Sequence, residues 1–369
     1  MRILFISRAY PPVTGGIENQ NYGLANALKS FADVKIIANK KGKRNLPFFL
    51  PWAGLAGLFF ASRFDAIILG DGVLSPIGRM LKFFYPRKKV FSIIHGLDIT
   101  YARKKSLLGR VYRSINIPAL KSLDKLVMVG NSTIEETVKS GILRDKCVFI
   151  PNGVDPKDIC EKHGRSELEN LIGMSLDEKK AIVRVGRYVK HKGTDWFIEE
   201  VMPKLPENYI LVAAGGVVAK KTPGDENIHP ICQKAVVDNK LKSRVVLLTN
   251  LLWRDMKVLF NTADLFISPN VKIEGSMEGF GINAIEGAAC GRVVVASRLE
   301  GLQDAITDGE NGFLIEPGNV EEYVRTITRI LEDDESRAEF SQRAKNYTTR
   351  NFSWDVIAKK YMEVLAGAR

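Results

Sequence analysis

Short apolar runs rich in Val, Ile and Leu recur along the whole chain and alternate with longer stretches of helical periodicity. Between the first two runs, for example, Ile17, Leu24, Leu28 and Phe31 are spaced as on one face of a helix. The first half of the chain contains predicted strands at Ile3–Ser7, Val34–Ala38, Ala66–Leu69, Val90–Ile94, Leu126–Val129 and Val148–Ile150. The second half contains predicted strands at Ala181–Val185, Ile210–Ala213, Val245–Leu248, Leu265–Ile267, Val293–Ala296 and Phe313–Ile315.

Strands that alternate with crossover helices form parallel sheets with helices on both faces. Two such sets predict an α/β protein with two Rossmann-like domains, whose ligands bind at the carboxyl ends of the strands. We expect one domain at residues 1–165 and a second at 166–350, because a PNGVDP turn and a polar stretch follow the sixth strand. A last helix, from about Trp354 within residues 351–369, could cross back to the first domain.

Composition is that of a globular protein, with 45% apolar and 26% charged residues over 369 positions. The four cysteines are far apart and form no C-x-x-C pair, which argues against a zinc site and a disulfide framework and fits a reducing cytosol. The apolar stretch at the start of the sequence is too short for a signal peptide and predicts a buried strand instead. We therefore expect a cytoplasmic protein.

The net charge of +12 is concentrated in residues 1–150, which hold 24 Lys and Arg against 9 Asp and Glu. The excess lies in three clusters, Lys40–Arg44, Pro86–Lys89 and Arg103–Arg113. The apolar run Leu46–Phe60 follows the first cluster but is shorter than the roughly 20 residues that span a bilayer. A basic rim beside Phe, Trp and Leu predicts an interfacial anchor on anionic lipid, with the peripheral inner face of the cell membrane as its location.

The basic half of the chain has two other interpretations. The apolar run could be a core helix flanked by solvated charges. Nucleic-acid binding would need a binding fold or a pattern of stacking aromatic residues, and the sequence has neither, so we expect no nucleic-acid partner.

Glu278 and Glu286 stand eight positions apart in MEGFGINAIEGAACG. Glu278 precedes a glycine-flanked turn, and Glu286 falls about one turn into a predicted helix that begins near Gly281. Helical side chains lean toward the N-terminus, so both carboxylates and the free N–H groups of the helix start would converge. This arrangement suits a ligand that combines hydroxyls with negative charge, such as a nucleotide sugar.

Two possible ligand-binding features follow predicted strands in the first half of the chain. Gly15 and Gly16 precede a helix, where a phosphate could approach the backbone closely, although the full G-x-G-x-x-G pattern is absent. His95 ends the fourth strand, at the edge where parallel sheets bind ligands. The alternative for each feature is a purely structural role.

Arg187 and Lys192 flank a loop between a strand and a helix that is expected to begin near Gly193. Two fixed cations would stabilise a departing pyrophosphate, whose negative charge grows as its bond breaks. The arginine offers a planar fork for phosphate oxygens and the lysine a point charge. A solvated basic loop is the alternative, and we expect Lys190 and His191 to be solvated neighbours.

The sequence contains no D-x-D motif, the usual way to hold a metal against pyrophosphate. Its acidic residues Glu332–Glu335 fall in a late helix, on an expected solvated face. We therefore predict metal-free catalysis without a cofactor, the nucleotide sugar being a substrate.

Seven segments taken in order resemble the retaining glycosyltransferases of the GT-B fold, specifically family 4. They are GGIENQNYGLANAL, HGLDIT, NSTIEETVKSG, IPNGVD, VGRYVKHKGTDWFI, EGFGINAIEGAACGRVVVAS and GENGFLIEPGN. Together they extend from Gly15 to Asn319 and cover most of the chain. Tyr188 and Gly287 depart mildly from the family's usual Leu and Ala.

The resemblance implies two Rossmann-like domains that face a central cleft, an N-terminal one for the acceptor and a C-terminal one for the nucleotide sugar. Glu278 and Glu286 match the E-x7-E motif, in which the first Glu holds sugar hydroxyls and the second grips the ribose. The N–H groups of Phe280, Gly281 and Ile282 would bind the sugar and phosphate.

The remaining matches concern the reacting groups. Arg187 and Lys192 correspond to the diphosphate-binding pair, and Gly15 and Gly16 to a loop that faces the donor phosphates. His95 corresponds to the residue that contacts the sugar near its reacting face. The resemblance implies that the departing phosphate deprotonates the acceptor on the same face, with Glu278 as a positioning residue first.

The resemblance thus implies a retaining hexosyltransferase that uses a UDP- or GDP-linked mannose- or glucose-type donor. Its expected acceptor is a lipid-linked glycan or a cell-envelope polysaccharide. The expected catalytic residues are His95, Arg187, Lys192 and Glu278. The alternatives are a non-transferring enzyme, such as an epimerase of the same fold, and a non-catalytic binder of sugar nucleotides.

Overall fold

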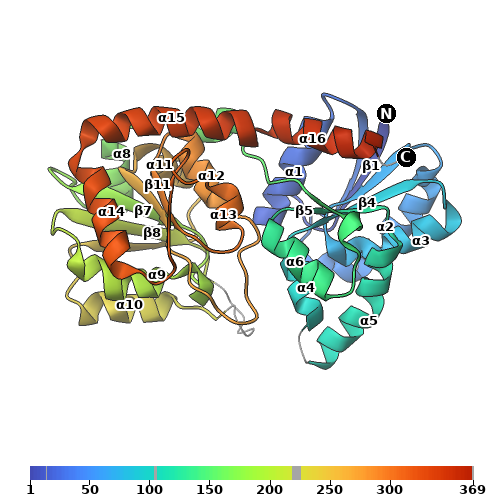
Figure 1. The fold of residues 1–369 in the computed structure, drawn as a ribbon, viewed down its shortest axis with the longest axis horizontal. Coiled ribbons are helices and arrows are strands. Elements are labelled where there is room, and N and C mark those ends of the chain that lie inside the picture. The colour runs from blue at the N-terminus through green and yellow to red at the C-terminus, as the bar shows by residue number, and fades with distance from the viewer. Residues whose placement is uncertain (14, 104–105, 218–225, 368–369) are drawn as a thin grey trace. The chain divides into compact units, whose positions relative to one another are not determined.

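The computed structural model describes residues 1–13, 15–103, 106–217 and 226–367 (Figure 1). The chain forms two compact units. Unit 1 comprises Met1–Gly153 together with Phe352–Arg369, and unit 2 comprises Val154–Asn351. Each unit has one parallel sheet of six strands between two layers of helices, which confirms the predicted α/β class.

The sheet of unit 1 has the strand order β2-β1-β3-β4-β5-β6, so its order reverses between β1 and β3. Its strands are β1 (Arg2–Ser7), β2 (Asp33–Ala38), β3 (Ala66–Leu69), β4 (Lys89–Ile94), β5 (Lys125–Met128) and β6 (Cys147–Phe149). Central strands are apolar on both faces because helices cover both: Ile3–Ile6 are wholly buried. Loops that follow β1 and β3 therefore meet at the switch point where ligands bind in such sheets.

The sheet of unit 2 has the order β12-β11-β10-β7-β8-β9 and reverses between β7 and β10. Its strands are β7 (Lys180–Val185), β8 (Tyr209–Gly215), β9 (Val245–Thr249), β10 (Leu265–Ser268), β11 (Val294–Ser297) and β12 (Phe313–Ile315). All the predicted strands of both halves are thus present, with ends that differ by at most a few residues.

Helices connect the strands and cover the sheets. Unit 1 has α1 (Gly16–Leu28), α2 (Leu46–Ala61), α3 (Ser75–Phe84), α4 (Leu97–Thr100), α5 (Leu107–Ser122), α6 (Asn131–Lys139) and α16 (Trp354–Gly367). Unit 2 has α7 (Pro156–Ile159), α8 (Arg165–Ile172), α9 (Thr194–Trp196), α10 (His229–Asp238), α11 (Trp253–Thr262), α12 (Ile282–Ala289), α13 (Leu302–Ala305) and α14 (Val320–Glu332). Helix α15 (Asp334–Phe352) leads to α16. In the part of the chain that the structure describes, no helix combines the length and apolar character needed to cross a membrane.

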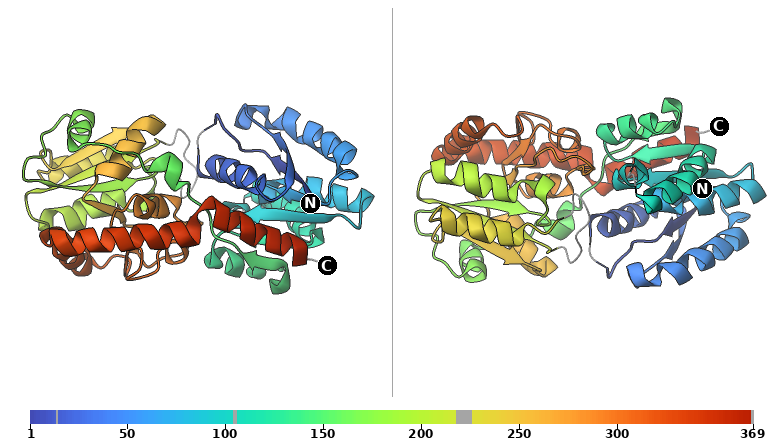
Figure 2. Two further views of the ribbon diagram at one scale, coloured as in Figure 1. Left: turned by 90° about the horizontal axis from the view of Figure 1, so that it is seen from above. Right: turned by 90° about the horizontal axis from the view of Figure 1, so that it is seen from below.

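The last helix of the chain belongs to unit 1, and both termini lie in that unit (Figure 2). Helix α16 packs on α1, and the indole of Trp354 occupies space that the missing side chains of two glycines leave open. A Cβ atom on Gly23 would lie 2.3 Å from this indole, and one on Gly153 would lie 2.5 Å from it. The Lys89 ammonium also donates a hydrogen bond to the Leu365 carbonyl at 3.0 Å.

The division between the units falls after Gly153, earlier than the boundary expected at residues 165 and 166. The stretch after Gly153 is tied to unit 2 by its side chains and backbone. Ile159 is 2% exposed, and its carbonyl accepts a hydrogen bond from Asn261 at 2.8 Å. Asp158 forms an ion pair with Lys257 at 3.0 Å. These contacts were not visible in a segment that sequence marks only as a turn and a polar stretch.

Candidate functional site

A buried ion pair lies at the switch point of unit 2. Lys192 ends a single 3₁₀ turn after β7, and Glu278 lies in the connection between β10 and α12. The Lys192 ammonium donates to Oε2 of Glu278, and the Asn270 amide donates to the same oxygen at 3.0 Å. Because β7 and β10 are adjacent parallel strands, the loops after them leave the sheet at the same edge. Two of the predicted site residues are therefore brought together.

The charge state of this pair follows from its surroundings. Each side chain is 13% exposed. Burial alone would raise the pKa of Glu278, but the charges of Lys192 and His191 and the hydrogen bonds from Lys192 and Asn270 lower it to about 2. Burial lowers the pKa of Lys192, as do Arg184 and Arg187 nearby, and Glu278 opposes them. At neutral pH Glu278 is a carboxylate too weakly basic to act as a proton acceptor.

A second buried cation, Arg184, shapes the turn that carries Arg187. Arg184 is 2% exposed on β7, and its guanidinium donates to the carbonyls of Gly186 and, at 3.1 Å, Arg187. Burial lowers its pKa to about 10, so it remains charged at neutral pH. The sequence analysis did not single out this residue, although an arginine inside an otherwise apolar strand was the signal for it.

Of the two neighbours of Lys192 that were expected to be solvated, Lys190 is exposed, with 47% of its side chain accessible, whereas His191 is buried. His191 is 6% exposed, and its Nδ1 lies 2.8 Å from the Ser276 hydroxyl. Lys190 forms an ion pair with the fully buried Asp195. The reason is close packing: a Cβ on Gly193 would lie 1.9 Å from the Pro269 carbonyl, so the 3₁₀ turn rests directly on the segment after β10.

Helix α12 begins at Ile282, as predicted, with Gly281 as its N-cap at φ 92°. A glycine has no side chain to cap the helix, so the first N–H groups of α12 have no side-chain cap. A Cβ at Gly281 would lie 2.6 Å from Cδ2 of Leu302. Upstream, the backbone N–H of Glu278 donates to Oε2 of Glu300 at 2.7 Å. Glu300, which nothing in the sequence pattern indicated, thus holds the turn before α12.

Glu286 lies one turn into α12, apart from the Lys192 and Glu278 pair. Burial raises its pKa to about 7, and the charge of Asp158 adds to this rise. None of the hydrogen bonds among the described side chains reaches its carboxyl group. Asn283, one turn before Glu286 on α12, instead donates to the Val185 carbonyl and joins this helix to the end of β7.

The predicted residues of unit 1 lie at the carboxyl edge of its own sheet. His95 follows β4, and its Nε2 lies 3.0 Å from the Gly70 carbonyl. Because a carbonyl only accepts, Nε2 carries the proton in the neutral ring and Nδ1 is an acceptor. Gly15 is the N-cap of α1, and Gly16 is its first residue. Oε2 of Glu18 lies 2.3 Å from the place of a Cβ on Gly15, so this carboxylate leans over the helix start.

A buried ion pair that the sequence analysis missed joins the loops of the unit 1 switch point. Nε of Arg8, after β1, lies 2.8 Å from Oδ2 of Asp71, after β3. Asp71 is fully buried; burial raises its pKa, while Arg8 acts against that rise. The nearby Asp98 carboxylate accepts from the N–H groups of Gly72 and His95 at 3.2 and 3.1 Å. This network holds the backbone around His95 in place.

Metal-ligating side chains do not gather in the described ranges: no group of three or more His, Cys, Asp or Glu there could hold an ion.

Two family models match the chain. The model described as glycosyl transferases group 1 matches residues 173–347, and the model described as glycosyltransferase family 4 matches residues 14–158. An uncharacterized glycosyltransferase of Methanocaldococcus jannaschii is 28% identical, over 99% of this chain and 97% of its own length. A Campylobacter jejuni N,N'-diacetylbacillosaminyl-diphospho-undecaprenol alpha-1,3-N-acetylgalactosaminyltransferase is 26% identical, over 74% of this chain and 69% of its own length.

Solved structures share the fold over nearly the whole chain. HepE of Anabaena in complex with UDP and glucose has a TM-score of 0.77 at 19% identity and covers 99% of both chains. Sucrose-phosphate synthase of Thermosynechococcus elongatus has a TM-score of 0.77 at 19% identity and covers 99% of this chain and 98% of its own. At this identity the likeness establishes the fold, which is GT-B with two Rossmann-like domains.

Proposed function

Because the chain belongs to the glycosyl transferases group 1 family and is a glycosyltransferase of the GT-B fold, we propose that it is a retaining, metal-independent hexosyltransferase. Its donor is a UDP- or GDP-linked mannose- or glucose-type sugar. Its acceptor is a lipid-linked glycan or a cell-envelope polysaccharide.

The buried pair of Lys192 and Glu278 is the observation that carries this proposal. A nucleoside diphosphate gains negative charge as the bond from the sugar to its phosphate breaks. Lys192, with Arg187 contributing positive charge to the same site, would stabilise that charge more strongly in the transition state than in the ground state. Fixed cations of this kind supply the charge neutralisation for which other enzymes use a metal.

Glu278 has the properties of a positioning residue in this reaction. Its carboxylate stays ionised and already accepts from Lys192 and Asn270, so it can orient Lys192 and accept hydrogen bonds from sugar hydroxyls. The proton of the attacking acceptor hydroxyl then goes to an oxygen of the departing phosphate. Attack and departure on the same face retain the configuration of the reacting carbon.

The other residues of the proposed site have supporting roles. Glu286 would bind the ribose hydroxyls, and the N–H groups of Phe280, Gly281 and Ile282 would bind the sugar and phosphate at the start of α12. In unit 1, Nδ1 of His95 is available to accept a hydrogen bond from a sugar hydroxyl in the neutral ring. Gly15 and Gly16 would face the donor phosphates once the Glu18 carboxylate moves away.

The relatives support the substrate classes. The Campylobacter jejuni relative is named for an acceptor linked to diphospho-undecaprenol, which is a lipid carrier. The Anabaena HepE structures contain UDP or UDP-glucose. These properties belong to those proteins and make a nucleotide-sugar donor and a lipid-linked acceptor the first substrates to test here.

A donor panel tests the proposed activity. Thermal-shift measurements with UDP-, GDP- and ADP-sugars identify the donor, and release of free nucleotide with an undecaprenyl-diphosphate-linked glycan then measures transfer. We expect nucleotide release and a product with retained anomeric configuration, unaffected by a chelator. Tight donor binding without nucleotide release would favour the non-catalytic binder, and a sugar isomerised on its nucleotide would favour the epimerase-like enzyme.

We also propose that unit 1 binds an anionic membrane surface through α2. Along this helix Phe48, Trp52, Leu55 and Phe59 recur at helical spacing and are 77%, 55%, 70% and 64% exposed. The outward face of α2 is therefore apolar, which is unusual for a helix in contact with water alone. Exposed Lys43 and Arg44 precede the helix and could pair with lipid headgroups. In the third basic cluster, Lys104 and Lys105 lie outside the described residues.

Co-sedimentation with vesicles tests this surface. The protein is expected to bind vesicles that contain phosphatidylglycerol and to lose binding in the variants K43Q/R44Q and W52S/L55S. Leu143→Ser is the control, since Leu143 is 65% exposed and precedes β6 at one edge of the unit 1 sheet, whereas α2 follows β2 at the other edge. Equal partitioning of the wild type and both double variants would remove the proposal.

A further inference from the structure

Two cysteines far apart in the sequence meet in unit 2. Cys160 follows α7 and Cys290 follows α12, and their Sγ atoms are 2.9 Å apart. Cys160 also donates to the Ala289 carbonyl at 3.2 Å. Both are free thiols, with Cys290 buried and Cys160 partly exposed. We propose that this pair is a site of reversible thiol oxidation, at which a hydroperoxide converts Cys160 and Cys290 to a disulfide.

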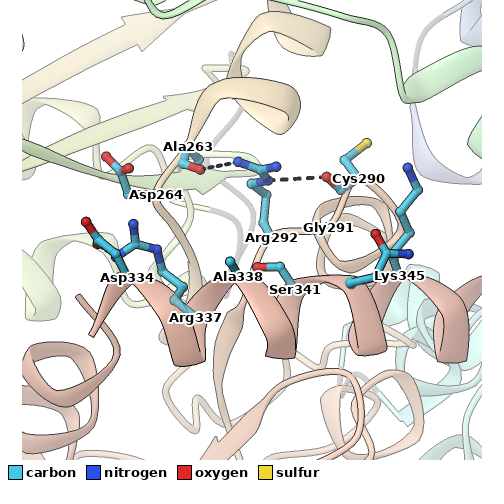
Figure 3. A pocket seen from close by; sticks show the side chains of 11 residues that line it. Ala263, Asp264, Cys290, Gly291, Arg292, Asp334, Arg337, Ala338, Ser341 and Lys345 are labelled. Carbon is cyan, nitrogen blue, oxygen red and sulfur yellow. Dashed lines mark hydrogen bonds and ion pairs between the residues drawn. The ribbon is translucent and has the colours of Figure 1, made fainter. Parts of the chain in front are cut away.

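The surroundings of the pair favour this chemistry. A cavity of about 350 Å³ reaches Cys290, and the basic side chains Arg292, Arg337 and Lys345 line it with the acidic Asp264 and Asp334 (Figure 3). Figure 3 shows Cys290 and Lys345 at the same end of this cavity. The cavity thus places positive charge beside Cys290, and a small oxidant can reach Cys160 because this thiol is partly exposed.

The two thiols have different roles. A hydrogen bond from Cys290 lowers the pKa of Cys160 against the effect of burial, and Lys345 and Arg292 lower it further. The same hydrogen bond and burial raise the pKa of Cys290. The thiolate is the nucleophile in thiol chemistry, so the more exposed Cys160 reacts first and Cys290 resolves.

The reaction balances with the hydroperoxide as the oxidant. The Cys160 thiolate attacks one peroxide oxygen, the O–O bond breaks, and the leaving oxygen takes up a proton to become an alcohol or water. Cys160 is then a sulfenic acid. The Cys290 sulfur attacks it, the S–O bond breaks, the S–S bond forms, and water leaves with the thiol proton. Two thiols lose two electrons, and a dithiol reductant reverses the change.

The cross-link would join two functional segments of unit 2. Cys290 lies four positions after Glu286, just past the end of α12, and Cys160 lies two positions after Asp158, whose charge acts on Glu286. Oxidation would tie the first segment of unit 2 to the helix that carries Glu286. In a reducing compartment such a disulfide is transient, which suits a redox-responsive site rather than a structural one.

Peptide mapping under non-reducing conditions tests the proposal on the full-length protein. After brief treatment with hydrogen peroxide at neutral pH and capping with N-ethylmaleimide, we expect one cross-linked pair that contains Cys160 and Cys290. Dithiothreitol should reverse it. The oxidised wild type should also unfold at a higher temperature than the reduced protein, because the link closes a long loop.

Cysteine variants distinguish the attacking thiol from the resolving thiol. The double variant C147S/C232S should still form the cross-link, and in C290S dimedone should trap Cys160 as the sulfenic acid. The proposal is wrong if native wild type forms no bond between Cys160 and Cys290. It is also wrong if Cys160 reacts with N-ethylmaleimide no faster than the buried Cys147. None of these measurements depends on sugar transfer, so they stand apart from the proposed function.

Discussion

At the scale of single residues, the candidate donor site depends on charges held away from water. Lys192 and Glu278 are both largely buried and satisfy each other, with Asn270 as a further donor. Removing one partner of such a pair leaves the other charge buried without compensation, which destabilises a protein by about 3–5 kcal/mol. The pair is therefore expected to matter for folding as well as for turnover, and tests must separate the two.

Lys192→Met is expected to lower kcat by about 100- to 1,000-fold while changing the KM for the donor much less, because the lysine faces charge that grows in the transition state. Nucleotide release under steady-state conditions measures both constants. Lys242→Met is the control, an exposed lysine of unit 2 outside the site. The double variant Lys192→Met/Glu278→Gln should regain stability without activity, since no buried charge remains unpaired. An unchanged kcat in Lys192→Met would contradict the assignment.

Glu286→Gln is expected to stabilise the ligand-free protein increasingly as pH rises from about 4.5 to about 7. The folded carboxyl has a pKa raised to about 7 by burial and by Asp158. In that window the folded state binds a proton that the unfolded state has lost, so wild-type stability falls with rising pH while a neutral amide is unaffected. Urea unfolding across this range measures the difference.

The control for this pH effect is Glu274→Gln, at an exposed carboxylate of the same unit. The free energy of unfolding of this variant should differ from that of the wild type by the same amount at every pH. If the stability difference between Glu286→Gln and the wild type does not change with pH, the raised pKa of Glu286 is contradicted. The same variant should weaken nucleotide binding, because the ribose loses a charged acceptor worth roughly 1.5–3 kcal/mol. If Glu286→Gln is more stable than the wild type but binds nucleotide more weakly, the Glu286 carboxylate serves binding rather than stability.

At the scale of elements, turns at strand ends position the site, and glycines permit their close approach. Gly281 caps α12 at φ 92°, and Gly193 rests on the Pro269 carbonyl. Arg184 fixes the turn after β7 through the carbonyls of Gly186 and Arg187. These contacts set where the helix start and the cations lie, so changes in them should affect binding without altering any charge.

Gly281→Ala and Gly318→Ala form a matched pair for this idea. Both glycines have positive φ, 92° and 81°, so each alanine incurs about 1–2 kcal/mol of backbone strain. Only the Cβ at position 281 meets a neighbour, Leu302, at 2.6 Å, whereas nothing lies within 4 Å of a Cβ at 318. Calorimetric titration should show at least tenfold weaker nucleotide binding for Gly281→Ala and unchanged binding for Gly318→Ala. Equal affinities would show that the start of α12 does not contact the nucleotide.

At the scale of the whole molecule, the chain leaves unit 1 after Gly153 and returns to it at Phe352. The returning helix docks by shape: the Trp354 indole lies against Gly23 of α1 and against Gly153. Unit 1 is thus completed only when the last residues of the chain are in place, so its stability should depend on contacts made by residues distant in sequence.

Gly23→Ala is expected to destabilise the protein by about 1–3 kcal/mol, since its Cβ would lie 2.3 Å from the Trp354 indole and displace α16. An alanine inside a helix is otherwise favourable by roughly 0.5–1 kcal/mol over glycine. Gly57→Ala in α2 is the control, because its Cβ would meet only ordinary contacts from 3.4 Å outward. The unfolding temperature should fall for Gly23→Ala and should stay the same or rise for Gly57→Ala. Equal shifts would mean that the close contact does not hold α16.

Much of the fold was predictable because its signals are local. Buried parallel strands are apolar on both faces, so apolar runs such as Ile3–Ser7 and Leu265–Ile267 predict strands directly. Gly281 before an apolar run predicts a helix start. The same locality explains one failure. His191 was expected in solvent but is buried, because a polar segment looks the same whether or not distant residues cover it.

The sequence by itself determined the α/β class, the strands, the start of α12 and a family resemblance carried by short motifs, because periodicity and motif spacing are properties of neighbouring positions. Only the tertiary structure decided that Lys192 and Glu278 form one ion pair, that Arg184 and Asp71 are buried, and that Cys160 meets Cys290. Such pairings depend on strand order and close packing between distant segments. Burial then sets the charge states, as it does for Glu278 and Glu286, and no local pattern encodes it.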